Sequence, residues 1–384
     1  MIRKCKDIDI TSLGLITAAV LACLRPAKKR RRYDTIELFA STLGVSRRQA
    51  ARSLAARDEA YLRAVDIIAR KMQADLLAGT PDIRKPGVTE RVDACSRKVR
   101  KVAVLNIRNL LYDHVAVIGL AEACRAIGEY QVSSIPGRGA EYGDKAIRKW
   151  LRGMRDKNVY HMKLDIRNFY GSVNQELLFA WLARRVANPK LLWLVRQLVS
   201  CVDKGMAIGS YLSQTLANLY LSSLYHLAKE GIFRTRRGKR IATFKHALFY
   251  MDDMLLIGLN SKAMKRGAQE LAVYAREQLG LEIKPGWSVR TLSERHPIDI
   301  MGFRYSGGKV SLRRRIYKYA RRMLARAARL GMVTLHASCR IASYKGYIEK
   351  TIAPKGLDCI SIFTAAGKAA SIYHERKNAL HQSA

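Results

Sequence analysis

The sequence predicts an α+β protein in which a mixed layer of strands and helices lies between helical segments. Three observations carry this prediction. Apolar residues recur at helical spacing in residues 35–77, strand-forming runs are densest in residues 161–305, and a basic helical segment begins at Arg313. Because helical patterns alternate with the strands of the middle region, we expect one sheet covered on one face.

The chain is strongly basic. Its 384 residues include 70 Lys and Arg against 31 Asp and Glu, a net charge of +39. A folded protein tolerates such self-repulsion more readily when it works against a polyanion. Nucleic acid is the leading candidate, because each neutralised phosphate releases counterions. A ribosomal or packaging protein could be equally basic, so the charge indicates a class of partner and no reaction.

Cysteine usage and hydropathy indicate the compartment. The seven cysteines are scattered, odd in number and never spaced as C-x-x-C, which argues against a disulfide framework or a zinc site. The longest apolar run near the N-terminus, residues 13–24, is about half the ~20 residues that a membrane-spanning helix needs. We therefore expect a cytoplasmic protein that does not bind a membrane.

Residues 1–90 are expected to form a basic helical N-terminal extension. The apolar segment 10–24 precedes a run of five basic residues, 28–32, and a linker with two prolines is expected at 79–87. Between them, residues 39–52 are similar to a helix-turn-helix, with a glycine at the turn and a serine as N-cap. Two packed helices with an ordinary cap are the simpler interpretation.

Periodicity predicts the remaining elements. The expected strands are residues 99–104, 160–166, 247–250, 254–258 and 298–305. The expected helices are residues 110–127, 145–154, 175–186, 190–199, 213–229, 263–279 and 313–329.

Two adjacent acids, Asp252 and Asp253, lie between two apolar strand-forming runs. Such a sequence favours a β-hairpin with both carboxylates at its tip. Carboxylates ~4 Å apart repel by about 4 kcal/mol at an effective dielectric near 20, so a bound cation is expected, and Mg²⁺ prefers oxygen ligands. Taken alone, the pair is equally compatible with an Asp-Asp turn that faces water.

A third acid, Asp165, ends an earlier apolar strand. Three acids from two neighbouring strands can hold two metal ions about 3.5–4 Å apart. One metal would lower the pKa of an attacking 3′-hydroxyl, and the other would stabilise the pyrophosphate as it leaves. The three acids therefore predict phosphoryl transfer.

Five segments resemble, in order, the motifs of reverse transcriptases, and the resemblance extends over about residues 95–345. They are residues 163–170 (motif A), 205–220 (motif B), 250–253 (motif C), 279–284 (motif D) and 300–303 (motif E, the primer grip). The resemblance implies an RNA-directed DNA polymerase, encoded by a bacterium or phage, that makes cDNA on an RNA template. It also implies deoxynucleoside triphosphates as substrates, a cDNA primer–template duplex as partner, and two Mg²⁺ ions, for which Mn²⁺ can substitute.

The same resemblance implies a right-hand architecture with fingers, a ferredoxin-like palm and a helical thumb. The expected domains are the extension at 1–90, fingers at 91–160, a palm at 161–305 with a fingers insertion at about 174–207, and a thumb and C-terminal tail at 306–384.

Roles for single residues also follow from the resemblance. Catalytic metal binding is assigned to Asp165, Asp252 and Asp253, with Ile166 as a further metal-binding position; Tyr170 is assigned to the steric gate against ribonucleotides, Arg138 to the loop that holds the triphosphate, and Lys284 to protonation of pyrophosphate. For Tyr170 and its neighbour Phe169, the alternative is that both are core aromatics.

Basic segments are expected to contact the nucleic acid. Lys98, Arg100 and Lys101 would face triphosphate or template, although a solvated strand face explains them equally well. The basic helix that begins at Arg313 would pack one face and lay the other along the template–primer backbone. Its expected contacts are Arg313, Arg314, Arg315, Lys318 and Arg322.

Motif B departs from the usual pattern. Most reverse transcriptases have Gln-Gly-x-x-x-Ser-Pro there, whereas this chain has Ile208-Gly209-x-x-x-Ser213-Gln214, four positions expected to bind substrate. Isoleucine cannot donate the hydrogen bonds of the usual glutamine, so discrimination against mispairs should weaken.

This variant resembles the enzymes of diversity-generating retroelements. Those copy a template RNA with frequent errors opposite adenine, and the cDNA rewrites a variable region of a target gene (mutagenic retrohoming). They act with a small basic accessory variability protein, which forms an oligomer. Three alternatives remain: a group II intron maturase-like RNA-binding enzyme, a phage-defence reverse transcriptase of the abortive-infection type, and a non-enzymatic basic binding protein.

Overall fold

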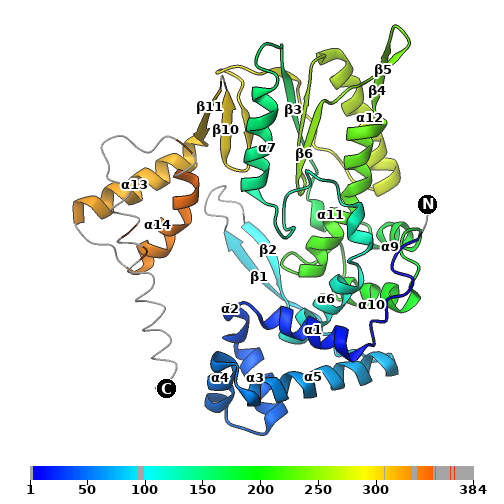
Figure 1. Ribbon diagram of the computed structural model, residues 1–384, viewed down its shortest axis with the longest axis vertical. Coiled ribbons are helices and arrows are strands. Elements are labelled where there is room, and N and C mark those ends of the chain that lie inside the picture. Colours follow the sequence, from blue (N-terminus) through cyan, green and yellow to red (C-terminus); the bar gives the residue numbers. More distant parts are fainter. Residues whose placement is uncertain are drawn as a thin grey trace. The chain divides into compact units, whose positions relative to one another are not determined.

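The computed structural model describes residues 3–92, 99–306, 308–330 and 335–348, together with residues 351, 364 and 367 (Figure 1). The chain divides into two compact units. The first contains the described residues up to 146 and residues 162–289, and the second contains residues 147–161 and those from 290 onward. Lys98 and most of the predicted C-terminal tail lie outside the described residues, and the predicted domain boundaries remain predictions.

Helices fill the N-terminal part of the first unit, as the periodicity predicts. They are α1 (Leu13–Leu24), α2 (Ala27–Arg30), α3 (Tyr33–Leu43), α4 (Arg47–Ala56) and α5 (Glu59–Ala78). Helix α1 packs against α5 and against α6 (Ile107–Gly119), with Ile16, Ala19 and Val20 fully buried. No helix among the described residues is long and apolar enough to cross a membrane.

A sheet forms the centre of the first unit, with strand β7 (Asp253–Gly258) between β6 (His246–Tyr250) and β3 (Tyr160–Asp165). Strand β7 is buried at every position after Asp253. Successive strand residues point to opposite faces, so both faces of β7 are covered. The expectation of a sheet covered on one face is therefore wrong at this strand, whose apolar residues do not alternate with polar ones.

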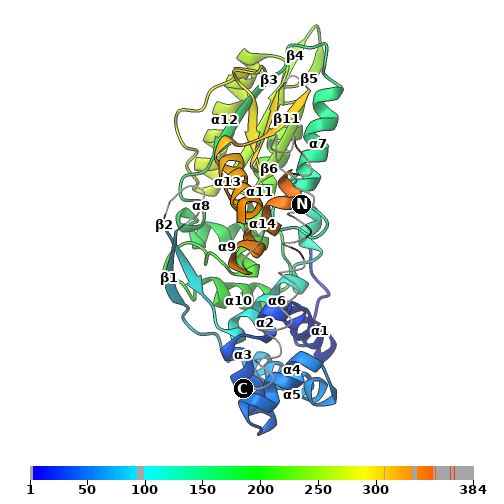
Figure 2. The same cartoon turned by 90° about the vertical axis from the view of Figure 1, so that its left-hand side faces the viewer.

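Helices surround this sheet. They are a 3-10 helix (Ala123–Ala126), α8 (Phe169–Ser172), α9 (Gln175–Ala183), α10 (Pro189–Val199), α11 (Tyr211–His226), a π-helical turn (Leu227–Gly231) and α12 (Ser261–Leu279). In both views α6, α9 and α10 lie between the sheet and the N-terminal helices (Figures 1 and 2). The chain passes between the two units within α7 (Ala140–Arg152) and within β3.

Two hairpins of the first unit contain strands that were not predicted, although the strand expected at residues 99–104 is present in the first of them. One joins β1 (Gly87–Val92) to β2 (Val99–Val104), and the other joins β4 (Phe233–Arg236) to β5 (Lys239–Ala242). Both are largely exposed and carry many charged residues, so neither shows the apolar alternation of a half-buried strand. The Arg237-Gly238 turn, with φ positive at both residues, is the signal that could have revealed the second hairpin.

The second unit contains β8 (Arg290–Thr291), which pairs with the start of β3, and an antiparallel sheet of β9 (Ile298–Ile300), β10 (Phe303–Ser306) and β11 (Lys309–Leu312). The single strand predicted at 298–305 is thus wrong. Met301 and Gly302 have φ values of 54° and 88° and turn the chain back. A Cβ at Gly302 would lie 2.9 Å from Ile316 Cδ1, so both the conformation and the space favour glycine.

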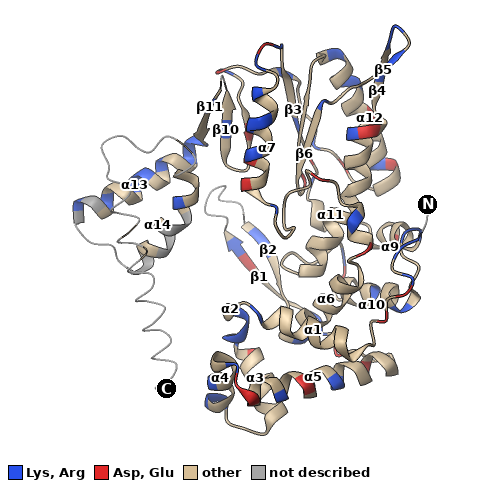
Figure 3. Ribbon diagram, viewed as in Figure 1, with Lys and Arg blue, Asp and Glu red and all other residues tan. Residues whose placement is uncertain are grey.

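Two helices follow, α13 (Arg314–Leu330) and α14 (Leu335–Ile348). Helix α13 is amphipathic, as predicted. Its buried side chains are Ile316, Ala320, Leu324 and Ala327. Its Lys and Arg residues are exposed, so the face that was predicted to lie along nucleic acid is accessible. Figure 3 shows how many of the residues of α13 are basic.

Asp113 anchors the start of helix α11. Its buried carboxylate accepts hydrogen bonds from Ser210 Oγ at 2.7 Å and from the Tyr211 backbone N–H at 3.1 Å. Ser210 is itself the N-cap of α11, and its hydroxyl accepts a hydrogen bond from the Ser213 N–H. Burial raises the pKa of Asp113 to about 6, because the hydrogen bonds that favour its ionised form offset only part of the desolvation.

This buried acid predicts a pH dependence of stability. A carboxyl whose pKa is higher in the folded than in the unfolded chain, where it is about 3.9, binds more protons when folded. We expect the free energy of unfolding to lose this contribution as pH rises from about 4 to about 6. Asp113→Asn, which keeps an acceptor for the Tyr211 N–H, should lack this component in urea titrations across that range. Identical pH slopes for the two proteins would contradict the assignment.

Candidate active site

The hairpin of β6 and β7 places two acids at its tip, as predicted. The strands pair antiparallel with Tyr250 opposite Asp253, so Met251 and Asp252 form a two-residue turn. Met251 takes a φ of 58°, a value that two-residue hairpin turns require. Asp253 is the first residue of β7, so consecutive acids occupy the turn and the strand that follows it.

Asp165 joins the two acids from the neighbouring strand. It is the last residue of β3, which lies beside β7 in the sheet. The pKa of Asp252 is raised, first by burial and then by the negative charges of Asp165 and Asp253. The three carboxylates therefore lie close enough to repel one another, although the first is far from the others in the sequence.

Two lysines neutralise part of this charge. Lys284 Nζ lies 2.6 Å from Asp165 Oδ1, and Lys163 Nζ lies 2.9 Å from Asp253 Oδ1. A role for Lys284 was predicted from the motifs, whereas none was predicted for Lys163. Its signal was spacing, because residues 163 and 165 of one strand point to the same face.

The donor set suits a hard divalent cation in its chemistry, since carboxylate oxygens are the preferred ligands of Mg²⁺. The positions of these carboxylates in the structure, however, are not those of a metal site. Within the described residues, no group of three or more His, Cys, Asp or Glu side chains is arranged to hold a metal ion. The ammonium groups of Lys163 and Lys284 instead lie against two of the three carboxylates. A metal ion would have to displace them.

Ile166 follows Asp165 and is fully buried. It pairs antiparallel with Ile283, and the hydrogen bonds on either side are made by its neighbours, from Arg167 N–H to Glu282 O and from Lys284 N–H to Asp165 O, both at 2.8 Å. In such a pair the C=O of Ile166 points away from the segment containing Ile283. Because the side chain of Ile166 is apolar, its backbone oxygen is the one atom of this residue that could serve as a metal ligand.

Tyr170 lies on the short helix α8, next to the acids. Phe169 is 3% exposed, whereas Tyr170 is half-buried, so these two aromatics do not both belong to the core. Burial and the charge of Asp252 raise the pKa of the Tyr170 hydroxyl. The carbonyl of Tyr170 accepts a hydrogen bond from Met206 N–H at 2.8 Å, and a Cβ at Gly205 would lie 2.2 Å from that oxygen. Glycine therefore lets the motif B segment approach Tyr170.

The rest of motif B contacts strand β2. The carbonyl of Ile208 accepts a hydrogen bond from Ala103 N–H at 3.2 Å, and the exposed Gly209 has a φ of 107°. Ile208 and Gln214 are half-buried, whereas Ser213 is 4% exposed near the start of α11. The structure thus brings Ile208 and Gly209 to β2 and places Ser213 and Gln214 on the helix that follows.

Arg138 lies in a loop that borders β6. Gln131 forms a parallel bridge with Phe249, and Val132 N–H donates to Phe249 O at 2.9 Å. The Arg138 guanidinium donates to the carbonyls of Gly128, at 2.5 Å, and Gln131, at 3.3 Å. Arg138 therefore holds its own loop together in this conformation.

The predicted nucleic-acid contacts are mostly exposed. Arg100 lies on β2 directly opposite Arg91 of β1, an arrangement of like charges that destabilises a strand pair unless an anion is near. In the second unit Arg314, Arg315, Lys318 and Arg322 are exposed on α13. Arg313 differs, because its guanidinium lies 2.6 Å from Asp299 Oδ1.

Comparison with known proteins supports the prediction made from the motifs. The family model for reverse transcriptase (RNA-dependent DNA polymerase) matches residues 83–305, more than half of the chain. No curated protein sequence matches this chain. One similar solved structure is apo telomerase from Candida tropicalis, truncated from its C-terminal domain, at 10% identity and a TM-score of 0.45. That match covers 65% of this chain and 60% of the telomerase chain, so this chain spans about 60% of its length.

The family match includes β3, the β6–β7 hairpin and all three converging acids. The chain therefore belongs to the reverse transcriptase (RNA-dependent DNA polymerase) family and has a polymerase fold of that kind, with mixed helices and strands.

Proposed function

We propose that this protein copies an RNA template into cDNA by two-metal nucleotidyl transfer. The observation that carries the proposal is the convergence of Asp165, Asp252 and Asp253 at one end of a buried sheet, in a chain of the reverse transcriptase family. Their mutual repulsion favours bound cations, and in-line transfer of a nucleotidyl group needs positioned charge more than protein nucleophiles.

In this proposal the three carboxylates and the carbonyl of Ile166 hold two Mg²⁺ ions. When bound, these ions would activate the primer 3′-hydroxyl and stabilise the leaving pyrophosphate. Lys163 and Lys284 now lie against two of the carboxylates and would turn away as the substrate arrives. Lys284 would then be placed to donate a proton to pyrophosphate.

Other residues would position the nucleotide. The ring of Tyr170, half-buried beside Asp252, would exclude a 2′-hydroxyl from the sugar site. Arg138 would exchange its two carbonyl partners for phosphate oxygens, which bind guanidinium more strongly. Ile208, Gly209, Ser213 and Gln214 would line the nucleotide and template side of the site.

The basic surfaces would bind the template–primer duplex. We assign the β1–β2 hairpin to the fingers, the sheet of β3, β6 and β7 to the palm, and α13 to the thumb. The opposed Arg91 and Arg100 and the exposed basic face of α13 suit contacts to phosphates, which read the shape of an RNA–DNA duplex and not its sequence.

We further propose that the enzyme is error-prone and belongs to a diversity-generating retroelement, where it would act with a small basic accessory protein. The support is Ile208, which stands in place of the usual glutamine and whose side chain cannot donate a hydrogen bond. A polymerase that lacks this polar contact relies more on base-pair shape, so mispairs should be accepted more often.

Loss of the central carboxylate should abolish synthesis. We expect Asp252→Asn to reduce extension of a DNA primer on an RNA template by roughly a hundredfold or more, because a neutral amide binds Mg²⁺ weakly. Gel-resolved primer extension with deoxynucleotides measures this loss. The same assay with ribonucleotides tests whether the site excludes a 2′-hydroxyl, which is the role proposed for Tyr170. Asp203→Asn, at an 86% exposed side chain, removes the same charge and should leave extension unchanged. An active Asp252→Asn variant would refute the proposed chemistry.

The identity of residue 208 should set fidelity. Ile208→Gln restores the usual polar side chain, and we expect severalfold fewer misincorporations opposite template adenine. Sequencing of cDNA made on a defined RNA template gives the error spectrum. Ile208→Val, which keeps an apolar side chain, should retain the wild-type spectrum. If the glutamine variant makes the same errors as wild type, the fidelity argument fails.

A further inference from the structure

Helices α3 and α4 form a helix-turn-helix. Three residues separate them, and the first, Gly44, ends α3 with a φ of 65°. Ser46 then caps α4 in a capping box, in which its hydroxyl accepts from Gln49 N–H and the Gln49 side chain accepts from Ser46 N–H. A short turn that contains glycine and leads directly into a capped second helix is characteristic of this motif.

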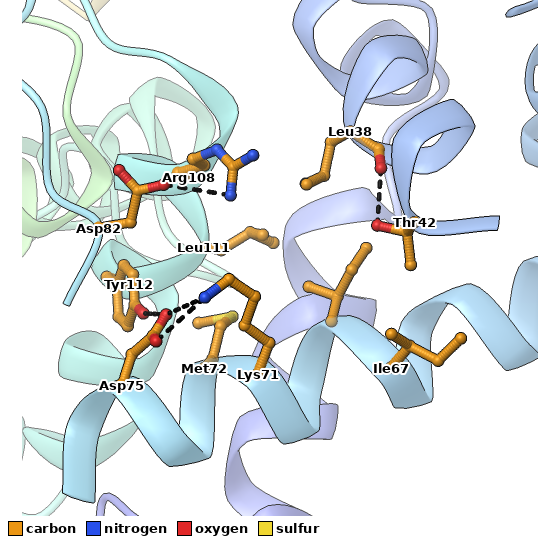
Figure 4. Close-up of a pocket in the computed structure, with 11 residues that line it drawn as sticks. Leu38, Thr42, Ile67, Lys71, Met72, Asp75, Asp82, Arg108, Leu111 and Tyr112 are labelled. Atoms are coloured by element: carbon orange, nitrogen blue, oxygen red, sulfur yellow. Dashed lines mark hydrogen bonds and ion pairs between the residues drawn. The ribbon is translucent and has the colours of Figure 1, made fainter. Parts of the chain in front are cut away.

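A third helix, α5, packs against both. Phe39 of α3 stacks on Tyr61 of α5, with ring centroids 5.7 Å apart, and Ala50 and Leu54 of α4 are buried. Helix α3 also borders a small pocket of about 50 Å³, which is lined by residues of α3, α5 and α6. Leu38 projects into this pocket (Figure 4). The packing of α3 on α5 holds it to the body of the first unit.

Helix α4 turns a basic face to solvent. Arg48 and Arg52, one helical turn apart, are both exposed, and so are Ala55 and Ala56 further along. The alanines leave room for another molecule to approach closely. Arg47 has a different role, because it pairs with Glu37 at 2.5 Å and lies over the Tyr33 ring, bracing α4 against α3.

More basic residues flank α4. Helix α2 packs against α4, and Lys28 and Arg31 beside it are exposed. Both helices carry Lys and Arg residues (Figure 3). Arg30 and Arg57 both donate to the carbonyl of Arg25. The pKa of Arg30 is lowered by burial and then by the charge of Arg57, so cations are crowded together here. Such crowding favours a polyanionic ligand.

We propose that α3, α4 and α5 form a binding module for B-form duplex DNA, separate from the polymerase site. Helix α4 would enter the major groove, with Arg48 and Arg52 toward base edges and Lys28 and Arg31 toward phosphates. The major groove of B-form DNA is about 12 Å wide and admits a helix, whereas that of A-form RNA is too narrow and deep for side chains to read. The occupant is therefore duplex DNA.

The test selects DNA duplexes from a random-sequence pool with the full chain. A saturating amount of an RNA–DNA hybrid is included to occupy the polymerase site. We expect an enriched sequence, because the recognition helix reads base edges. Arg48→Ala/Arg52→Ala should bind that duplex at least about tenfold more weakly. Because both arginines would read base edges, the double substitution should lower the slope of log affinity against log salt concentration by less than the value of about two expected for the loss of two phosphate contacts.

The matched control is Lys262→Ala/Arg266→Ala, which removes two exposed cations at the same spacing from helix α12. It should retain the affinity, and circular dichroism during thermal unfolding should show that both variants fold. The proposal is overturned if no sequence is enriched, if an RNA duplex of the same sequence binds as tightly, or if the control loses as much affinity as the α4 variant.

Discussion

Repulsion among Asp165, Asp252 and Asp253 is the constraint on which the rest of the site depends. Three carboxylates crowd one end of a buried sheet, and the charges of two raise the pKa of the third. The ammonium groups of Lys163 and Lys284 compensate part of this negative charge. In the proposed function, the oxygen atoms that now pair with lysine would instead ligate divalent cations.

The surrounding loops are held by backbone contacts, which explains where glycine is required. Gly205 lets the motif B segment lie against the carbonyl of Tyr170, and Gly209 lets it lie against β2. Asp113, a buried acid from α6, fixes the helix that continues from this segment. A side chain at Gly205 or Gly209 would therefore move the backbone at Tyr170 or at Ile208, although neither glycine lies among the acids.

The sequence predicted the candidate active site better than the exposed hairpins and turns of the chain. Two apolar runs around Asp252 and Asp253 specify a buried hairpin, and the apolar strand that ends at Asp165 predicted a third acid beside it. Strand β2 was predicted, but β1, β4 and β5 were missed because exposed strands with several charged residues show no apolar alternation. The turn at Met301-Gly302 was missed because the apolar pattern continues through it. The spacing of Lys163 from Asp165 places it on the same face of its strand, but its pairing with Asp253 depends on which strands become neighbours.

The most direct test of the convergence of the acids is localised cleavage by a bound metal. Fe²⁺ in place of Mg²⁺, with ascorbate and peroxide, produces radicals that cut the backbone near the ion. Mass spectrometry of the fragments should show cuts near both Asp165 and the Asp252–Asp253 turn, suppressed together by excess Mg²⁺. Cuts confined to one of these segments, or unaffected by Mg²⁺, would contradict a metal site shared by the three acids.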